Sequence, residues 1–107
     1  MSPVVNKNIL KYLNEESSII VLLTDKQGNV LESNDFASKL IGKKLEGLNL
    51  RDIFIYFVKP FDISEHLEDS SKKVLINITS AAQMPGTWYF HFYNLGESVL
   101  AIGEANI

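Results

Sequence analysis

The stretch from Ile19 to Gly47 most constrains what this chain can fold into, because two strand patterns there lead directly into a capped helix. Residues 19–23 form a short apolar run, which is typical of a strand buried on both faces. A turn follows in which Gly28 can take the positive φ that other residues resist. Val30-Leu31 then resumes the strand pattern. The sequence therefore predicts a β-hairpin.

The hairpin is followed by a short helical pattern. Its apolar residues share one helix face and are Phe36, Ala37, Leu40 and Ile41. Asn34 stands before them, and Asn is a favoured N-cap because its side-chain oxygen accepts an otherwise unsatisfied backbone N–H. Gly42 follows the last apolar residue, where a helix commonly ends through a left-handed residue. We therefore predict a helix between Asn34 and Gly42.

The order of these features resembles the opening half of a PAS domain. The chain reads Asp25-x-x-Gly28-x-Val30, then Asn34-x-x-Ala37, with Gly42 and Gly47 after the helix. PAS domains pair the pattern D-x-x-G-x-I with N-x-A and a later glycine, and the resemblance extends over roughly residues 17–106. It implies a sensory fold with an internal pocket, one wall of which is the helical middle section.

Composition limits the classes of partner. At 107 residues the chain is expected to be one compact domain, and it has no cysteine for disulfides, thiolate metal sites or LOV-type flavin chemistry. The net charge is −3, with Lys43-Lys44 and Lys72-Lys73 as the only basic pairs, which predicts no contact with nucleic acid or a membrane. The N-terminus lacks a signal-peptide pattern, so we expect a soluble, cytoplasmic protein.

The N-terminal residues 1–16 predict a flanking helix outside a PAS-like domain spanning 17–107. Val5, Ile9, Tyr12 and Leu13 form its apolar stripe. This stripe packs either on the outer face of its own sheet or against a second copy of the chain. For the second case, a homodimer, the interface residues are Val5, Ile9 and Leu13.

The middle of the chain reads as short helices. Asn49-x-x-Asp52 resembles a capping box, and Asp62-x-x-Glu65 repeats the signature. A helical stripe follows the first cap, and Pro60 ends it. The stripe consists of Ile53, Phe54, Phe57 and Val58.

Three strands close the chain, over 73–79, 87–95 and 98–105. With the hairpin they predict an α+β fold: a five-stranded antiparallel sheet with short helices on one face and an N-terminal flanking helix. Strand alternation sorts the last three strands into two faces. One is wholly apolar: Val74, Ile76, Ile78, Trp88, Phe90, Phe92, Val99, Ala101 and Gly103. The other is mixed: Leu75, Asn77, Thr79, Tyr89, His91, Tyr93, Leu100, Ile102 and Glu104.

Two orientations of this sheet fit the pattern. The plain interpretation turns the apolar face to the core and the mixed face to solvent. The alternative, which we favour at this stage, turns the mixed face into a ligand pocket, because a few polar groups in an apolar cavity are typical of small-molecule sites. The predicted ligand-binding residues are then Asn77, Tyr89, His91, Ile102 and Glu104, with Phe57 from the helical section.

The resemblance bears on the cofactor. Asn77, His91 and Glu104 fall where flavin-binding PAS domains carry Asn, Asn and Gln, and the loss of two amides argues against flavin. Haem-binding PAS sensors take an axial His from the region of His66, but the polar neighbours of His66 predict a solvated helix end and argue against haem. Two histidines without a third nearby ligand predict no metal site. The cofactor stays open.

The chain contains no nucleophile elbow, phosphate loop or spaced His/Glu motif, so we predict no catalysis. The resemblance implies a sensory or regulatory module of a larger signalling protein. Such a module would bind a small ligand or partner and act on a covalently linked histidine kinase, cyclase or transcription activator. The alternative is a ligand-free module for homodimerisation or protein interaction.

Overall fold

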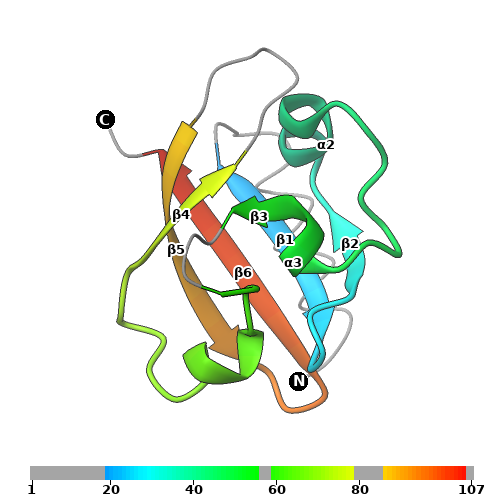
Figure 1. The fold of residues 1–107 in the computed structure, drawn as a ribbon. Helices are drawn as coiled ribbons and strands as arrows, with labels where there is room; N and C mark the ends of the chain where they lie inside the picture. The colour runs from blue at the N-terminus through cyan, green and yellow to red at the C-terminus, as the bar shows by residue number, and fades with distance from the viewer. Residues whose placement is uncertain (1–18, 56–58, 79–85, 106–107) are drawn as a thin grey trace.

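The computed structural model describes residues 19–55, 59–78 and 86–105. The elements are β1 (Ile20–Asp25), β2 (Val30–Ser33), α2 (Asp35–Ile41), α3 (Leu50–Ile53), β3 (Phe54–Ile55), the 3-10 helix η1 (Ile63–His66), β4 (Val74–Ile78), β5 (Gly86–Asn94) and β6 (Ser98–Ala105). In these ranges the strands form one antiparallel sheet in the order β2-β1-β6-β5-β4-β3. Figure 1 shows α2, α3 and η1 together on one face of it.

The apolar sheet face predicted from the alternation packs against these helices and forms the main core. Ile76 of β4, Phe90 and Phe92 of β5 and Ala101 of β6 are almost completely buried there. The helical side contributes Ala37, Leu45, Leu50, Ile53 and Ile63. The plain interpretation is thus right for the apolar face, because a wholly apolar face gains most when helices remove it from water. The mixed face is not turned wholly to solvent, since Leu100 is buried in a second cluster with Val21 and Leu23.

The cap of α2 is as the sequence predicts. Asn34 is the N-cap, and its Oδ1 accepts a hydrogen bond from the backbone N–H of Ala37 at 3.2 Å. Gly42 ends the helix in the left-handed region at φ 86°. Asn34 does more than cap, because the same Oδ1 accepts from Val21 N at 3.1 Å and its Nδ2 donates to the carbonyl of Ile19 at 2.7 Å. One side chain therefore ties the start of α2 to β1.

The middle section differs from the predicted helical stripe. Asn49 caps α3 as expected, but the helix ends at Ile53 and the next two residues form β3. Phe54 pairs with Ile78 and Ile55 with Asn77. The aromatic and β-branched residues of β3 favour a strand, and they pair with the otherwise unpaired edge of β4. The sheet consequently has six strands in the described ranges, one more than predicted. Phe57 and Val58 lie outside the described residues, as does the predicted helix over 1–16.

The turn between β1 and β2 is held by Asp25. Its Oδ1 accepts from the backbone N–H groups of Gln27 and Asn29, each at 2.9 Å, and its Oδ2 accepts from Asn29 Nδ2 at 2.9 Å. Asn49 joins this turn to α3, because its Nδ2 donates to Gln27 O and Asn29 Oδ1 at 3.0 Å. Although partial burial opposes it, hydrogen bonding from Asn29, Gln27 and Gly28 lowers the pKa of Asp25 below 3.8.

Replacing Asp25 by Ala is therefore expected to lower the free energy of unfolding by about 1–2 kcal/mol, because two backbone donors lose their acceptor. The folded carboxyl has the lower pKa, so its contribution is complete above pH 3.8 and is lost as the pH falls through the folded value. Urea unfolding of both proteins over a pH series measures this difference. Asp25→Asn, which keeps one acceptor oxygen, should lose less; an equal loss would contradict the assigned role.

Among the described residues, no helix reaches the length and apolar character needed to cross a bilayer.

Candidate functional site

Three rings form a stack between η1 and the sheet. Phe61 precedes η1, His66 ends it, and their rings lie nearly parallel with centroids 5.2 Å apart and planes inclined by 7°. The His66 ring also stacks on Phe92 of β5 at 5.5 Å and 28°. A 3-10 helix has three residues per turn, so His66 lies on the same side as buried Ile63 and points toward the sheet.

Two further rings extend this stack into the core. Phe54 of β3 meets Phe61 edge-on at 5.0 Å and Phe90 of β5 at 4.7 Å. Phe90 in turn stacks on Phe92 at 5.9 Å. We call these five rings the aromatic cluster: Phe54, Phe61, His66, Phe90 and Phe92. It connects β3, η1 and β5, three elements that are separate in the sequence.

His66 is the titratable member of the aromatic cluster. Both ring nitrogens are shielded from solvent. Burial lowers the pKa of His66 below 6.5, because the charged form loses hydration; Glu65 and Asp62 oppose this shift, whereas Lys72 and Lys59 add to it. The imidazole is therefore neutral at neutral pH. The polar neighbours of His66 predicted a solvated helix end, and this prediction is wrong for its ring.

A cavity of about 240 Å³ opens beside His66. Its lining consists of Glu65, His66, Glu68, Asp69, Lys72 and Val74. Three carboxylates thus face one ammonium group. Glu65 forms an ion pair with Lys59, and Asp69 accepts hydrogen bonds from the backbone N–H and the hydroxyl of Ser71 at 3.0 and 2.6 Å. Polar groups therefore make up most of the lining, and His66 is the member of the aromatic cluster that reaches it.

A groove of about 520 Å³ forms a second hollow near η1. It is lined by Lys26, Gln27, Asn49, Arg51, Pro60, Phe61, Asp62, Ile63 and Ser64. Phe61 of the aromatic cluster thus lines this groove, whereas His66 lines the cavity described above. The two hollows therefore reach the aromatic cluster at different rings.

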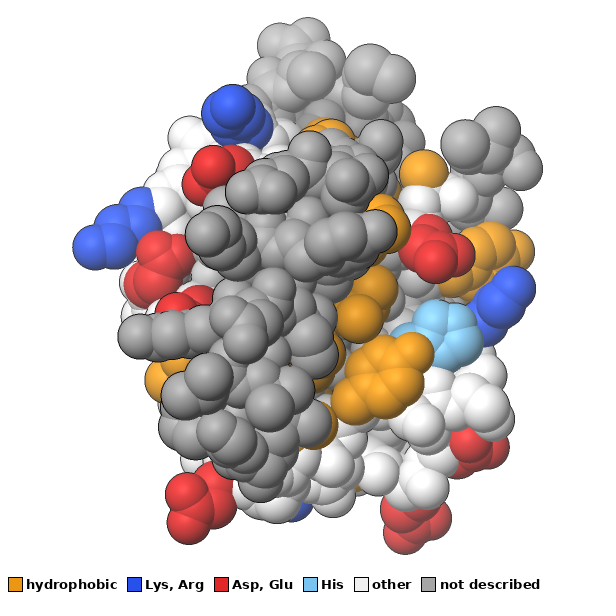
Figure 2. All heavy atoms as spheres, turned by 180° about the vertical axis from the view of Figure 1, so that it is seen from behind, with side chains coloured by type: hydrophobic (Ala, Val, Ile, Leu, Met, Phe, Trp, Pro, Cys, Tyr) orange, Lys and Arg blue, Asp and Glu red, His pale blue; other side chains and the backbone are white. Residues whose placement is uncertain are grey.

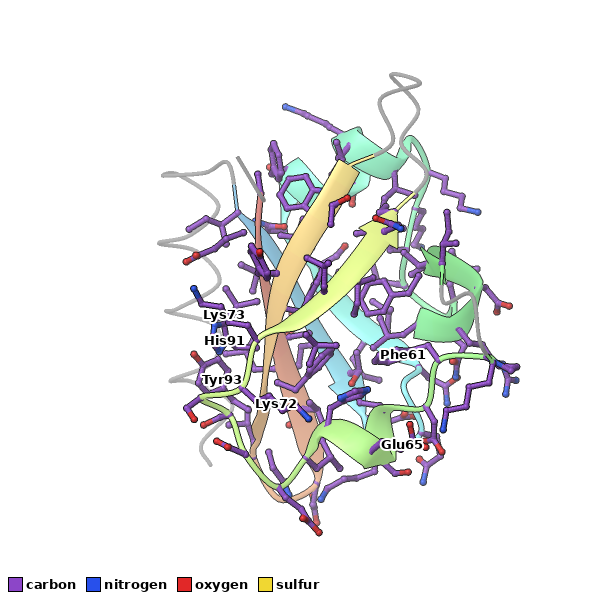
Figure 3. The ribbon with its side chains drawn as sticks, turned by 60° about the vertical axis from the view of Figure 1, so that its left-hand side comes forward. Phe61, Glu65, Lys72, Lys73, His91 and Tyr93 are labelled. Atoms are coloured by element: carbon purple, nitrogen blue, oxygen red, sulfur yellow. The ribbon has the colours of Figure 1, made fainter. Side chains whose placement is uncertain are left out.

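The five strand residues predicted to bind a ligand lie on the opposite face of the sheet. Tyr89 and His91 of β5 stand directly across from Glu104 and Ile102 of β6, and Asn77 of β4 accepts a hydrogen bond from Thr87 at 2.8 Å. The structure thus brings the five strand residues of that prediction onto three adjacent strands. Figure 3 shows His91 and Tyr93 on one side of the sheet and Phe61 and Glu65 on the other.

The interpretation that turned this mixed face toward the helical section is therefore wrong. Hydrophobic contact with α2, α3 and η1 selects the wholly apolar face, which leaves the mixed face outside. The His91 ring Nδ1 lies 2.8 Å from the carbonyl oxygen of Ser70, and the Lys73 ammonium lies 5.4 Å from the centre of the Tyr89 ring. Figure 2, seen from this side, shows hydrophobic side chains among charged ones. Ligand binding by the outer face stays a prediction.

Other predicted site residues lie outside the described ranges: Phe57 of the ligand set and Val5, Ile9 and Leu13 of the dimer set. Conversely, the sequence interpretation did not single out Phe61 and Phe92 as neighbours of His66. The i, i+3 spacing of Ile63 and His66 after the Asp62 cap could have indicated their shared direction. Their proximity to Phe92 depends on tertiary packing.

Comparison with known proteins identifies the fold. No family model and no curated protein matches the sequence. The PAS domain of an HTR-like protein from Haloarcula marismortui superposes with a TM-score of 0.73 at 16% identity, over 96% of this chain and 93% of that one. The PAS domain of the Cronobacter turicensis RpfR quorum-sensing receptor, in complex with BDSF, superposes with a TM-score of 0.70 at 15% identity. The match covers 86% of this chain and 97% of that one. These matches show the same fold at low sequence identity.

Proposed function

We propose that this chain, which has the fold of a PAS domain, is the sensory module of a larger signalling protein and binds a small molecule at the aromatic cluster. The carrying observation is the Phe61–His66–Phe92 stack, in which His66 lies against two apolar rings and also lines a mostly polar cavity. An apolar interior with a few polar groups is the usual make-up of a small-molecule site. A structural neighbour, the RpfR domain, is described with the small molecule BDSF bound.

The size of the cavity suggests how binding would be transmitted. At about 240 Å³ it is smaller than the roughly 300–1,000 Å³ typical of ligand pockets. A ligand would therefore have to displace η1 from β5 in order to reach the rings. Binding would favour a displaced η1 over the packed one, which is the differential affinity that a switch requires. The change would then pass along β5 and β6 to a linked output domain, and the role is regulatory rather than catalytic.

The test is native mass spectrometry of the freshly purified chain beside a denatured control. We expect an adduct that is retained natively and lost on denaturation. Phe61→Ala opens the cluster and should abolish the adduct, whereas His91→Ala on the outer face is the matched control and should keep it. Loss of the adduct in His91→Ala alone would instead assign the ligand to the outer face. A bare monomer under all conditions would contradict ligand binding.

The alternative function, a ligand-free homodimerisation module, is favoured by apolar exposure on the outer face. Leu75 and Tyr93 remain 52% and 37% exposed there. A bare chain at twice the monomer mass in the same spectra would support this function. Leu75→Glu would then be expected to restore the monomer mass, and an unchanged dimer would contradict that face as the interface.

A further inference from the structure

The position of the His66 ring favours its neutral form over its protonated form. The ring lies between the Phe61 and Phe92 faces, and both of its nitrogens are shielded from water. A second proton would place a positive charge on nitrogen atoms that are shielded from water, and a poorly hydrated charge is costly. The stacked position is therefore the position of the neutral ring.

A receiving site for the charged ring lies next to the stack. His66 lines the cavity together with Glu65, Glu68 and Asp69. The carboxylates outnumber the one cation in the lining, Lys72, and Glu65 is already paired with Lys59. Asp62 also acts on His66 from the start of η1. Within the described residues, the rings packed against His66 from β5 and from the segment before η1, Phe92 and Phe61, carry no charge.

We propose that His66 is a proton-operated latch: its neutral ring holds η1 against β5, and its protonated ring leaves the stack for the carboxylate-lined cavity and releases η1. The His66 ring stacks on Phe92 from the end of η1, so its withdrawal removes one of the contacts that hold η1 against the sheet and leaves buried Ile63 as another. This device needs no small molecule. It therefore stands whether or not the proposed ligand binds.

The direction of the response follows from proton linkage. The folded pKa of His66 lies below 6.5, so the closed latch binds fewer protons than the open one. Opening therefore becomes more favourable as the pH falls below 6.5, at up to about tenfold per pH unit, until the folded pKa is passed. At higher pH, where His66 is neutral in both the closed and the open form, the latch stays closed and is insensitive to pH.

The experiment is NMR of the full chain across a pH series, following the His66 imidazole and the amide exchange of residues 63–67. The chain has two histidines, so a spectrum of His91→Gln assigns the His66 signal. We expect the His66 midpoint below 6.5 and amide exchange, corrected for intrinsic rates, that accelerates by about tenfold per pH unit below that value. The chemical shifts of the Phe92 ring protons should change with pH along the same titration curve as His66.

His66→Phe is the matched control, because it keeps an aromatic ring in the stack but cannot bind a proton. Its corrected exchange over 63–67 should not vary with pH. Glu68→Gln, which removes one cavity carboxylate, should reduce the acceleration in the protein that retains His66. A His66 midpoint at or above 6.5, or an acceleration that persists in His66→Phe, would overturn the latch. If His66→Phe does not fold, the His66 titration midpoint and the pH dependence of the Phe92 ring shift in the unmodified chain still test the proposal.

Discussion

Asn34→Ala is expected to lower the free energy of unfolding by about 3 kcal/mol or more, one of the two largest effects that the fold predicts. Asn34 is 1% exposed, and its side chain makes three hydrogen bonds to backbone groups. Removal leaves the N–H groups of Val21 and Ala37 without this acceptor, and buried unsatisfied groups cost far more than an average hydrogen bond gains. Urea unfolding followed by circular dichroism measures the loss.

Asn34→Asp distinguishes the two hydrogen bonds that Asn34 accepts from the one that it donates. It retains an oxygen for the two N–H donors but cannot donate to the carbonyl of Ile19. We expect a loss at least as large as that of Asn34→Ala at neutral pH, because a buried carboxylate oxygen would face the carbonyl oxygen of Ile19. A difference below about 1 kcal/mol between Asn34→Ala and the unmodified chain would mean that water replaces the side chain and would contradict this role.

Gly103→Ala is expected to cost about 2–3 kcal/mol through overpacking. Gly103 of β6 pairs with Phe90 of β5, and an added Cβ would lie 2.6–2.8 Å from the Cζ, Cε1 and Cε2 atoms of the Phe90 ring. Phe90 cannot yield easily, because it is completely buried between Phe54 and Phe92. The aromatic cluster therefore requires a residue without a side chain at this position.

A double-mutant cycle tests the cause of this loss. Phe90→Leu removes the atoms that the new Cβ would meet, so the cost of Gly103→Ala should become smaller in the Phe90→Leu background. Thermal or urea unfolding of the four proteins gives the coupling energy. Additive losses in the double variant would show that the strain lies in the backbone of β6 rather than against the ring.

Local signals in the sequence were sufficient for the elements at the start of the chain. Asn34 and Gly42 mark the two ends of α2, because an N-cap and a left-handed exit depend on residues next to the helix. The short strand β3 could not be foreseen in this way. Phe54 and Ile55 suit either a helix stripe or a strand, and the open edge of β4 decides between them.

The candidate site was less accessible to prediction. Alternation separates the two sheet faces correctly, but the pattern does not state which face the helices cover. The resemblance to flavin-binding domains drew attention to His91 and Glu104, whereas the helices cover the face of Phe90 and Phe92. His66 has polar sequence neighbours and ring nitrogens that are shielded from solvent, because its direction is set by the 3-10 turn and by a partner far away in the sequence.

The pairing of β1 with β6 also has a mechanical meaning. Ile20, at the start of the first strand, lies opposite Gly103, near the end of the last, in the middle of the sheet. The described chain thus enters and leaves at the same end of two antiparallel neighbours. Tension applied between Ile20 and Gly103 would break the hydrogen bonds between β1 and β6 one pair after another, rather than loading all of them together in shear. A pull on either flank would therefore reach the centre of the sheet first and meet little resistance there.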